Sequence, residues 1–346
     1  MKPALLLLSL LLATIGFGEP RGAGVGQERV TVDEKTAAVI RGALKYLASE
    51  QQSNGSWTEH NEKYVTAMTG YTLLAFMATG NLPGEGEYGK VVANGARFLA
   101  DSIQADGTYE PRHIGQYMYG HGIATIALAE LYGQTRSAEL RSKLEKAVKI
   151  ILGSQNAAGG WRYSPRVGDA DISVTVLQVV ALRAAKNAGL DVPQESIERA
   201  VQYVHSCYDE SSGGFCYQPR QRAPGFARTA AAIYSLQVCG RYDDEQVLSG
   251  AAYLIREGHI PSKRKQEWFT YGHFYAAPAM YMIGGDTWEK WYTDIKKLLL
   301  EHVQQKNDTA YWTTDLDSRA PGPLYCTAVF TTILAMPYHY LPLYQR

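Results

Sequence analysis

A spacing of about 52 residues between large aromatic side chains constrains the fold of this chain more than any other feature. Each aromatic closes a turn between two helical segments, and successive intervals are 52, 52, 54, 53 and 44 residues. A near-constant period of this length indicates that one supersecondary unit is repeated along the chain. The six aromatics are Trp57, Tyr109, Trp161, Phe215, Trp268 and Trp312.

Each unit has the pattern of a helical hairpin with one solvated and one buried helix. In the third unit the first segment carries Glu145, Lys146 and Lys149, whereas the second, 172–188, is apolar nearly all round. A helix with a charged stripe faces water, and a helix that is apolar on every side must be buried. Glycine before the aromatic permits the positive φ that ends the first helix.

These units predict an all-α fold, namely a closed α/α toroid of six helical hairpin repeats over residues 36–346. Six buried helices ringed by six outer ones would hide apolar surface that neither layer can hide alone. An open superhelical solenoid is the alternative. The second helices of the units are predicted over 65–79, 119–132, 172–188, 226–238, 273–283 and 325–336.

The N-terminus has the features of a secretory signal. Lys2 precedes an apolar run over 4–13, and Gly16 and Gly18 suit a cleavage site before Glu19. We therefore predict a signal peptide over 1–18, a flexible lead-in over 19–35, and export to the periplasm or the extracellular space. An uncleaved membrane anchor is the alternative.

Charge and cysteine content restrict the partners and cofactors. The chain has 34 basic and 34 acidic residues, and this balance argues against nucleic acid and anionic membranes as partners. Cys207 and Cys216 flank a turn and can close a short loop in an exported protein, whereas Cys239 and Cys326 fit buried free thiols equally well. Cys-x-x-Cys spacing is absent, so the spacing indicates no zinc, and no cofactor is predicted.

The pattern Gln-x-x-x-Gly-x-Trp, found at 51–57 and again at 155–161, resembles the repeat of the squalene–hopene cyclase and protein prenyltransferase superfamily. The resemblance covers about 36–346 and implies the α/α toroid fold, which polysaccharide lyases and non-catalytic thioester domains share. Cyclases of the superfamily use two such barrels, so one barrel does not make a complete triterpene cyclase. The Asp-x-Cys zinc motif of prenyltransferase β-subunits is missing, so no prenyltransferase α-subunit is expected as a partner.

An acidic pair, Asp169 and Asp171, follows the third turn and is similar to the Asp-x-Asp-Asp motif of class II terpenoid cyclases. The resemblance implies that Asp171 is an acid that protonates an alkene or epoxide, with Asp169 as its partner. Such an acid needs a desolvated, acid-crowded site. Ile172 replaces the third acid of the motif. The structural alternative is that both residues cap the helix that begins at Ile172.

Residues at the N-terminal ends of the inner helices are expected to line the mouth of a central cavity, where the turns converge. His121 or His273 would serve there as acid or base, although packing against backbone carbonyls explains a buried histidine as well. A lyase would pair the acids with Arg228 or Arg112. The predicted lining residues are Tyr64, His113, Tyr117, His121, Arg228, His273, Tyr275 and Tyr325.

The leading functional prediction is an exported toroid that binds, and modifies by acid catalysis, an isoprenoid-like or other apolar small molecule in its cavity. A non-catalytic scaffold or ligand-binding module of the cell envelope is the first alternative, and a polysaccharide lyase is the second. The aromatic C-terminus, 337–346, is predicted to seal one end of the barrel after Pro337 ends the last helix.

Overall fold

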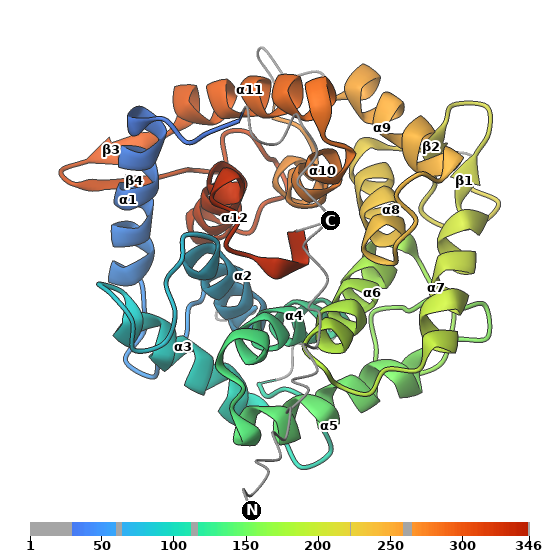
Figure 1. Ribbon diagram of the computed structural model, residues 1–346, viewed down its shortest axis with the longest axis horizontal. Coiled ribbons are helices and arrows are strands. Elements are labelled where there is room, and N and C mark those ends of the chain that lie inside the picture. The colour runs from blue at the N-terminus through green and yellow to red at the C-terminus, as the bar shows by residue number, and fades with distance from the viewer. Residues whose placement is uncertain (1–29, 60–63, 112–116, 222, 259–264, 345–346) are drawn as a thin grey trace, which may run out of the picture.

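The computed structural model describes residues 30–59, 64–111, 117–221, 223–258 and 265–344, and its helices form two concentric rings (Figure 1). The outer ring consists of α1 (Glu34–Ser49), α3 (Gly89–Ser102), α5 (Ala138–Ser154), α7 (Gln194–Ser206), α9 (Glu245–Glu257) and α11 (Gly285–His302). The inner ring consists of α2 (Val65–Ala78), α4 (Tyr117–Thr135), α6 (Ile172–Asn187), α8 (Phe226–Val238), α10 (Phe269–Ile283) and α12 (Pro323–Ala335). Outer and inner helices alternate along the chain, which confirms the predicted α/α toroid of six hairpins.

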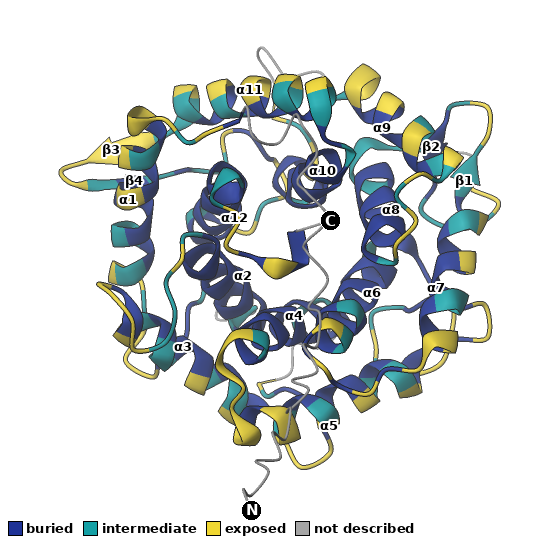
Figure 2. Ribbon diagram, viewed as in Figure 1, coloured by how far each residue is buried: buried dark blue, intermediate teal, exposed yellow. Residues whose placement is uncertain are grey.

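The burial of the two rings follows the polarity of their sequences (Figure 2). Every residue of α2 after Val65 is buried. In contrast, α5 buries one face only, and the charged residues of its other face remain outside. Apolar surface removed from water is the main favourable term in folding, so the inner ring with the inward face of the outer ring forms the core.

The turn of the third unit shows what the glutamine, the glycine and the tryptophan of the repeated pattern do in the structure. The side chain of Gln155 donates to the carbonyls of Gly159 (2.9 Å) and of Ser196 (2.8 Å), and thus ties the turn to the next outer helix. Gly159 has φ of 97°, and a Cβ there would lie 2.0 Å from the Arg199 carbonyl oxygen. Trp161 covers the turn, with its Nε1 donating to the carbonyl of Ile151 (2.7 Å).

The first and sixth units repeat the tryptophan contact of this turn, but the fifth does not. Nε1 of Trp57 and Nε1 of Trp312 donate to the carbonyls of Leu47 (2.6 Å) and Leu299 (2.8 Å) in their own outer helices. Trp268, in contrast, is 51% exposed and immediately precedes α10 with φ of 63°. The expectation that Trp268 packs over a turn is therefore wrong.

The ring is closed by contacts between its first and last units. α12 packs against α2 and α1, and the hairpin β3 (Gln304–Lys306) to β4 (Thr309–Tyr311) places β4 against α1. The rings of Tyr46 and Tyr311 stack at 5.1 Å, and the backbone N of Tyr325 donates to Oε1 of Glu59 (3.0 Å). These contacts establish a closed toroid rather than an open solenoid.

The C-terminal segment covers one end of the barrel. After α12 the chain forms η1 (Met336–Tyr338) and η2 (Pro342–Tyr344), and η2 lies inside the ring of inner helices in Figure 1. Leu341, Leu343 and Tyr344 are buried there. The backbone N of Leu343 donates to Oε2 of Glu130 in α4 (3.3 Å). The predicted seal is thus present and includes a hydrogen bond to a buried carboxyl group.

The first residues of the fold differ from the predicted boundary. Val30 is buried, and Asp33 caps α1 by accepting from the backbone N of Thr36 (2.8 Å), so part of the predicted lead-in belongs to the toroid. The predicted signal peptide lies outside the described residues. Within the described residues, none of the helices has the length and apolar character needed to cross a bilayer. A second short hairpin, β1 (Tyr208–Asp209) to β2 (Gly214–Phe215), forms the fourth turn.

Candidate functional site at the mouth of the toroid

The inner helices keep accessible surface in their first turns. Tyr119 in α4, Ser173 in α6 and Tyr271 in α10 are partly exposed, whereas the middle of each of these helices is buried. η2 covers the opposite end of the barrel, because its Leu343 donates to Glu130 in the C-terminal half of α4. The N-terminal ends of the inner helices therefore form the open mouth of the toroid, where ligand sites of barrel-like folds are commonly found.

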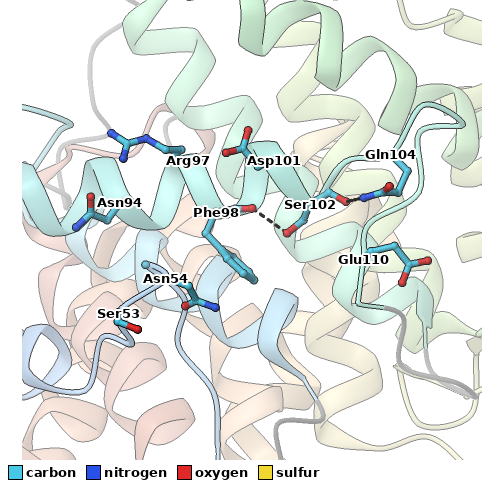
Figure 3. Close-up of a pocket in the computed structure, with 10 residues that line it drawn as sticks. Ser53, Asn54, Asn94, Arg97, Phe98, Asp101, Ser102, Gln104 and Glu110 are labelled. Atoms are coloured by element: carbon cyan, nitrogen blue, oxygen red, sulfur yellow. Dashed lines mark hydrogen bonds between the residues drawn. The ribbon is translucent and has the colours of Figure 1, made fainter.

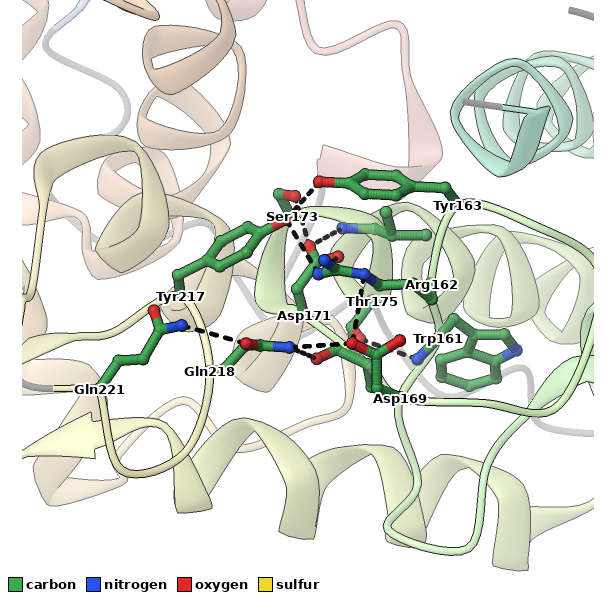
Figure 4. A network of polar contacts seen from close by, with 12 residues as sticks. Trp161, Arg162, Tyr163, Asp169, Asp171, Ser173, Thr175, Tyr217, Gln218 and Gln221 are labelled. Atoms are coloured by element: carbon green, nitrogen blue, oxygen red, sulfur yellow. Dashed lines mark hydrogen bonds and ion pairs between the residues drawn. The ribbon is translucent and has the colours of Figure 1, made fainter. Parts of the chain in front are cut away.

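Asp171 lies at this mouth as the N-cap of α6, and both of its oxygens are engaged (Figure 4). Oδ1 accepts from the backbone N of Val174 (3.0 Å) and from the hydroxyl of Ser173 (2.5 Å). Oδ2 accepts from Nη1 of Arg162 (2.7 Å), and the Asp171 side chain has no exposed surface. The carboxylate is a helix cap and the buried half of an ion pair.

Asp169 does not form a carboxyl pair with Asp171. Its side chain is 66% exposed, lies 3.5 Å from Nε of Arg162, and accepts from Nε2 of Gln218 (3.4 Å). A proton donor to an alkene needs an acidic hydrogen directed at the substrate in a water-excluded site. An enclosed Asp171 that faces a guanidinium and an exposed Asp169 do not provide one. The geometry therefore favours the capping interpretation for Asp171, whereas Asp169 contacts Arg162 and Gln218 and is not the cap of α6.

Arg162 also organises two tyrosines around the ion pair. Its guanidinium carbon lies 4.5 Å from the centroid of the Tyr163 ring and 5.4 Å from that of Tyr217, within the range of cation–π attraction. The phenol oxygens of Tyr163 and Tyr217 are joined by a very short hydrogen bond. Burial raises the pKa of the Tyr217 phenol above its ordinary value, so this group stays protonated at neutral pH.

Ser173 connects this group to tyrosines of two further inner helices. The phenol of Tyr119 shares a hydrogen bond with the Ser173 hydroxyl (2.7 Å), and the phenol of Tyr271 donates to the Ser173 carbonyl (2.8 Å). The Tyr119 ring stacks on that of Tyr163 at 5.9 Å. We define the mouth cluster as Tyr119, Arg162, Tyr163, Ser173, Tyr217 and Tyr271.

Four of the predicted lining residues lie at or below this mouth. Tyr275 packs against Tyr271 (5.0 Å between centroids), and both Tyr275 and Tyr325 are buried in the interior of the barrel. Arg228 lies 5.8 Å from the centroid of the Tyr217 ring. Tyr64 precedes α2 and is partly exposed. His113 and Arg112 lie outside the described residues.

Two other predicted lining residues, Tyr117 and His121, face the outer ring instead of the cavity. Nε2 of His121 is bonded to the carbonyl of Ala147 in α5 (3.0 Å), and Nδ1 to the phenol of Tyr117 (3.0 Å). The carbonyl requires a donor, so Nδ1 is the acceptor for the phenol. Burial lowers the pKa of His121 to about 4. The predicted acid–base role of His121 is replaced by packing between α4 and α5.

His273 likewise faces outward. Its ring stacks on Phe269 (4.0 Å) and faces Trp291 of α11 (6.1 Å), and Nδ1 is bonded to the Phe269 carbonyl (2.9 Å). Burial lowers its pKa to about 4. His273 is therefore not a residue of the mouth, contrary to the sequence prediction.

The described residues contain no group of three or more His, Cys, Asp or Glu side chains arranged to hold a metal ion. All four cysteines are free thiols, so the short loop between Cys207 and Cys216 is not closed by a disulfide. A backbone hydrogen bond from Cys216 N to the Cys207 carbonyl (2.8 Å) joins the two positions instead.

A polar hollow of about 330 Å³ lies on the outer wall beside α3, between the first two turns (Figure 3). Several of its polar groups are engaged in the fold. The Ser102 hydroxyl donates to the Phe98 carbonyl (2.8 Å), Gln104 donates to the Ser102 carbonyl (3.1 Å), and Asp101 pairs with Lys143 (2.8 Å). We attribute this hollow to the packing of successive units.

Sequence reasoning missed most of the mouth cluster. Arg162 and Tyr163 directly follow the repeated Gln-x-x-x-Gly-x-Trp turn pattern, and nothing in the sequence separates them from the residues that form the turn. Helix geometry offered one usable signal: Tyr271 and His273 are two residues apart, so they point to nearly opposite sides of α10. The same relation separates Tyr119 from His121, and in both helices the tyrosine faces the lumen.

The fold and the mouth cluster together define an α/α toroid with an aromatic and polar opening at the N-terminal ends of its inner helices. The chain belongs to the family described as a domain of unknown function, DUF6288, whose model matches residues 36–232. None of the curated proteins matches its sequence.

Solved structures with the same architecture include enzymes of different activities. One is the cellobiose 2-epimerase from Bacillus thermoamylovorans (13% identity, 88% of this chain and 98% of that chain, TM-score 0.67). Another is an inactive variant of the α-1,6-mannanase GH76A of Salegentibacter sp. in complex with α-1,6-mannotriose (9% identity, 89% and 100%, TM-score 0.65). A third is a variant of the type II terpene cyclase MstE from Scytonema (14% identity, 89% and 98%, TM-score 0.59). At these identities the likeness is one of fold alone.

Proposed function

We propose that this protein binds a neutral saccharide at the mouth cluster, without acid catalysis by Asp171. The observation that carries the proposal is the stacked pair Tyr119 and Tyr163, partly exposed beside the exposed carboxylate of Asp169 and the amide of Gln218. A sugar ring presents C–H groups on its faces and hydroxyls at its edge. Aromatic faces next to hydrogen-bonding groups complement both features.

Binding rather than turnover follows from the state of the two carboxylates. Hydrolysis of a glycosidic bond uses two carboxyl groups that both reach the substrate. Here Asp171 is enclosed by Arg162, Ser173 and the backbone of Val174, so Asp169 alone is accessible. The arrangement supports a ligand-binding module, which was the first alternative derived from the sequence.

The solved structures of the same fold show that α/α toroids bind small ligands of more than one class. One toroid is known in complex with α-1,6-mannotriose, and another is an epimerase of cellobiose. The terpene cyclase is known in complex with geranylgeranyl dihydroxybenzoate, which has a long apolar chain. The fold thus accommodates both classes of ligand, and the mouth residues of this chain must decide between them.

An isoprenoid-like apolar ligand is the second candidate, and one observation favours it. The phenols of the mouth cluster are hydrogen-bonded to one another or to Ser173, so an apolar chain could cover their rings without leaving these groups unpaired. It would, however, lie against the charged pair of Arg162 and Asp169. Desolvation of such charges is costly, which is why we rank the saccharide first.

Titration calorimetry with α-1,6-mannotriose, cellobiose and geranylgeraniol tests the proposal. We expect one of the saccharides to bind and Tyr163→Ala to weaken its binding at least about tenfold, which corresponds to roughly 1.4 kcal/mol. Tyr311→Ala is the matched control, because Tyr311 also belongs to a stacked tyrosine pair, with Tyr46, but on the outer wall. The control should bind like the wild type.

Each outcome separates the candidates. Binding of geranylgeraniol alone, with the same dependence on Tyr163, would replace the saccharide by the isoprenoid. Binding that is equal in Tyr163→Ala and the wild type would reject the mouth cluster as the site. If none of the three probes binds, the scaffold alternative is favoured and the proposal fails.

A further inference from the structure

An exposed indole at the rim of the mouth is not explained by the fold. Four of the six tryptophans, Trp57, Trp161, Trp288 and Trp312, have almost no accessible surface. Trp268, in contrast, is 51% exposed and is the N-cap of α10, so it lies at the mouth end of that helix. Exposure of a large apolar side chain costs free energy, and ligand sites are commonly lined by aromatic groups that a ligand then covers.

The surrounding structure holds this indole in an unfavourable backbone conformation. Trp268 has φ of 63°, in the left-handed region that is unusual for a bulky residue. The buried carboxylate of Asp317 maintains it, because Oδ1 accepts from the backbone N of Trp268 (3.1 Å) and Oδ2 from that of Thr270 (2.8 Å). Oδ1 also accepts from the backbone N of Arg319 (2.8 Å). Strained residues that are maintained in this way are typical of ligand-binding sites.

Charged groups lie beside the exposed indole. The guanidinium carbon of Arg319 lies 6.0 Å from the centroid of the Trp268 ring, and Nη2 of Arg319 pairs with Oε1 of Glu267 (3.1 Å). The side chains of this pair are 55% and 61% exposed, so both can contact a ligand. An aromatic ring with hydrogen-bonding groups beside it is the combination that the stacked tyrosines also provide. The rim thus offers a second position for a sugar ring.

Tyr271 links this position to the stacked tyrosines. The carbonyl of Trp268 accepts from the backbone N of Gly272 (2.8 Å), so Tyr271 lies in the helical turn that follows the indole. The Tyr271 ring lies 6.4 Å from that of Tyr119, which stacks on Tyr163 at 5.9 Å. All three tyrosines are partly exposed. Neighbouring aromatic side chains therefore extend along the mouth from Tyr163 to Trp268.

The barrel axis beneath these side chains is filled by other rings. Tyr275 has no exposed surface and packs against Tyr271 at 5.0 Å between centroids. Tyr71 of α2 and Tyr325 of α12 lie edge to face at 5.0 Å, and each is 6% exposed. Among the described residues, these close-packed rings leave no path for a sugar ring toward the sealed end. A saccharide at the mouth therefore lies across the opening and does not enter it end-on.

We infer that the mouth binds an extended saccharide of several rings that lies across the opening, and that Trp268 contacts the ring farthest from Tyr163. The inference rests on the proposed function and specifies its ligand. Because neither terminus of the saccharide enters the barrel, an internal segment of a longer chain fits the site as well as a chain end does. The indole covers a face of the last ring, and Arg319 and Glu267 bond hydroxyls at its edge.

Calorimetry with saccharides of two lengths tests the inference: α-1,6-mannobiose against α-1,6-mannotetraose, and cellobiose against cellotetraose. In the series that binds, the tetrasaccharide should bind at least about tenfold more tightly than the disaccharide. Trp268→Ala should lower the affinity for the tetrasaccharide to that for the disaccharide and leave the disaccharide unchanged, whereas Tyr163→Ala should weaken both. Tyr340→Ala is the matched control, because Tyr340 is similarly exposed (54%) but lies at the sealed end.

Two further measurements address the indole and the chain end separately. Trp268 is the most exposed of the six tryptophans, so binding of the tetrasaccharide should reduce the quenching of protein fluorescence by acrylamide in the wild type but not in Trp268→Ala. A hexasaccharide whose terminal sugar has been reduced to the alditol should bind as tightly as the tetrasaccharide. Thermal unfolding establishes that each variant is folded, and Trp268→Asn, which tolerates a positive φ, replaces Trp268→Ala if that variant is not.

The outcomes distinguish this inference from the proposed function. Equal affinity for the two lengths, or a tetrasaccharide affinity that is unchanged in the Trp268 variants, overturns the inference, whereas saccharide binding that depends on Tyr163 still supports the proposed function. Loss of binding when the terminal sugar is reduced would indicate recognition of a chain end and overturns the inference as well. If none of the saccharides binds, both fail.

Discussion

At the scale of single residues, the ion pair between Arg162 and Asp171 is the main fixed element of the mouth. The carboxylate has no exposed surface and the guanidinium side chain is 27% exposed, so the charges are shielded unequally from water. Arg162 meanwhile supports the rings of Tyr163 and Tyr217. Removal of the carboxylate therefore affects a helix cap, a charge pair and the orientation of two tyrosines together.

We expect Asp171→Ala to lower the free energy of unfolding by about 2–4 kcal/mol, because it removes the cap of α6 and leaves Arg162 without its buried partner. Asp171→Asn keeps an acceptor for the backbone N of Val174 and should cost less. Urea denaturation measures both variants. Asp169→Asn is the control, since its exposed carboxylate should contribute less than about 1 kcal/mol. Equal effects of Asp169→Asn and Asp171→Ala would contradict this account.

Glu130 is a second residue whose state has a measurable consequence. Burial raises its pKa from 4.5 to about 7, with the hydrogen bond from Leu343 acting in the opposite direction. Between these values the folded protein holds a proton that the unfolded chain has released. The contribution of Glu130 to the free energy of unfolding is therefore fully present below about pH 4.5. It is lost as the pH rises through 7, and the loss amounts to about 3 kcal/mol at most.

The variant Glu130→Gln should remove this dependence, because an amide does not ionise yet can still accept from Leu343. We expect it to match the wild type near pH 4.5 and to exceed it in unfolding free energy at pH 8 by about 1–3 kcal/mol. The quantity to measure is the difference in unfolding free energy between the two proteins at each pH. Burial lowers the pKa values of His121 and His273 to about 4, so both proteins also become less stable as the pH falls below 6.5, and the difference cancels this effect. A pH-independent difference would show that Glu130 is not the titrating group.

At the scale of elements, the turns of the first four units each contain one glycine that approaches the next outer helix. Gly159→Ala places a Cβ 2.0 Å from the Arg199 carbonyl oxygen in a backbone conformation with φ of 97°. We expect a loss of about 2–4 kcal/mol in unfolding free energy, because both the clash and the positive φ must be relieved. Gly153→Ala, inside α5 with open space at its Cβ, should instead stabilise by about 0.5–1 kcal/mol. Opposite signs in thermal unfolding are the decisive result.

The seal formed after α12 is the other element with a direct test. Deletion of 337–346 removes the buried side chains of Leu341, Leu343 and Tyr344, and each apolar side chain of this kind contributes about 1.5–3 kcal/mol. The melting temperature should fall markedly. Leu343→Ala, which keeps the chain intact, should cost about 2–4 kcal/mol. Unchanged thermal stability of the deletion would show that the segment is not a seal.

The sequence predicts the limits of the helices well, but it does not predict which side of a buried helix a given side chain faces. The segment 226–238 is predicted and observed with the same limits, and 172–188 differs from α6 by one residue, because an apolar segment of more than about ten residues favours a buried helix over a strand. It could not orient His121 or His273. α4 and α10 are buried nearly all round, so both sides of each helix look alike in sequence, and only their packing distinguishes the lumen from the outer ring.

At the scale of the whole molecule, the mouth cluster could not be assembled from the sequence for a different reason. Arg162 and Tyr163 come from the third unit, Tyr217 from the fourth and Tyr271 from the fifth, and the period aligns units without indicating which side chains reach across them. The same limit applies to Trp268, whose regular interval predicted an aromatic packed over a turn, whereas its side chain is half exposed. The features that repeat between units predict the ring of helices, whereas the mouth cluster consists of side chains that the repeat does not predict.

The closure of the ring also has a kinetic consequence. The hydrogen bond between Tyr325 and Glu59 joins residues 266 positions apart, so it can form only after all six hairpins have been synthesised as far as Tyr325. Until then the exposed apolar sides of the first and last units lack their partners. Such long-range closure is slow relative to the pairing of neighbouring hairpins, and a nascent chain will expose an aggregation-prone edge that a chaperone could recognise.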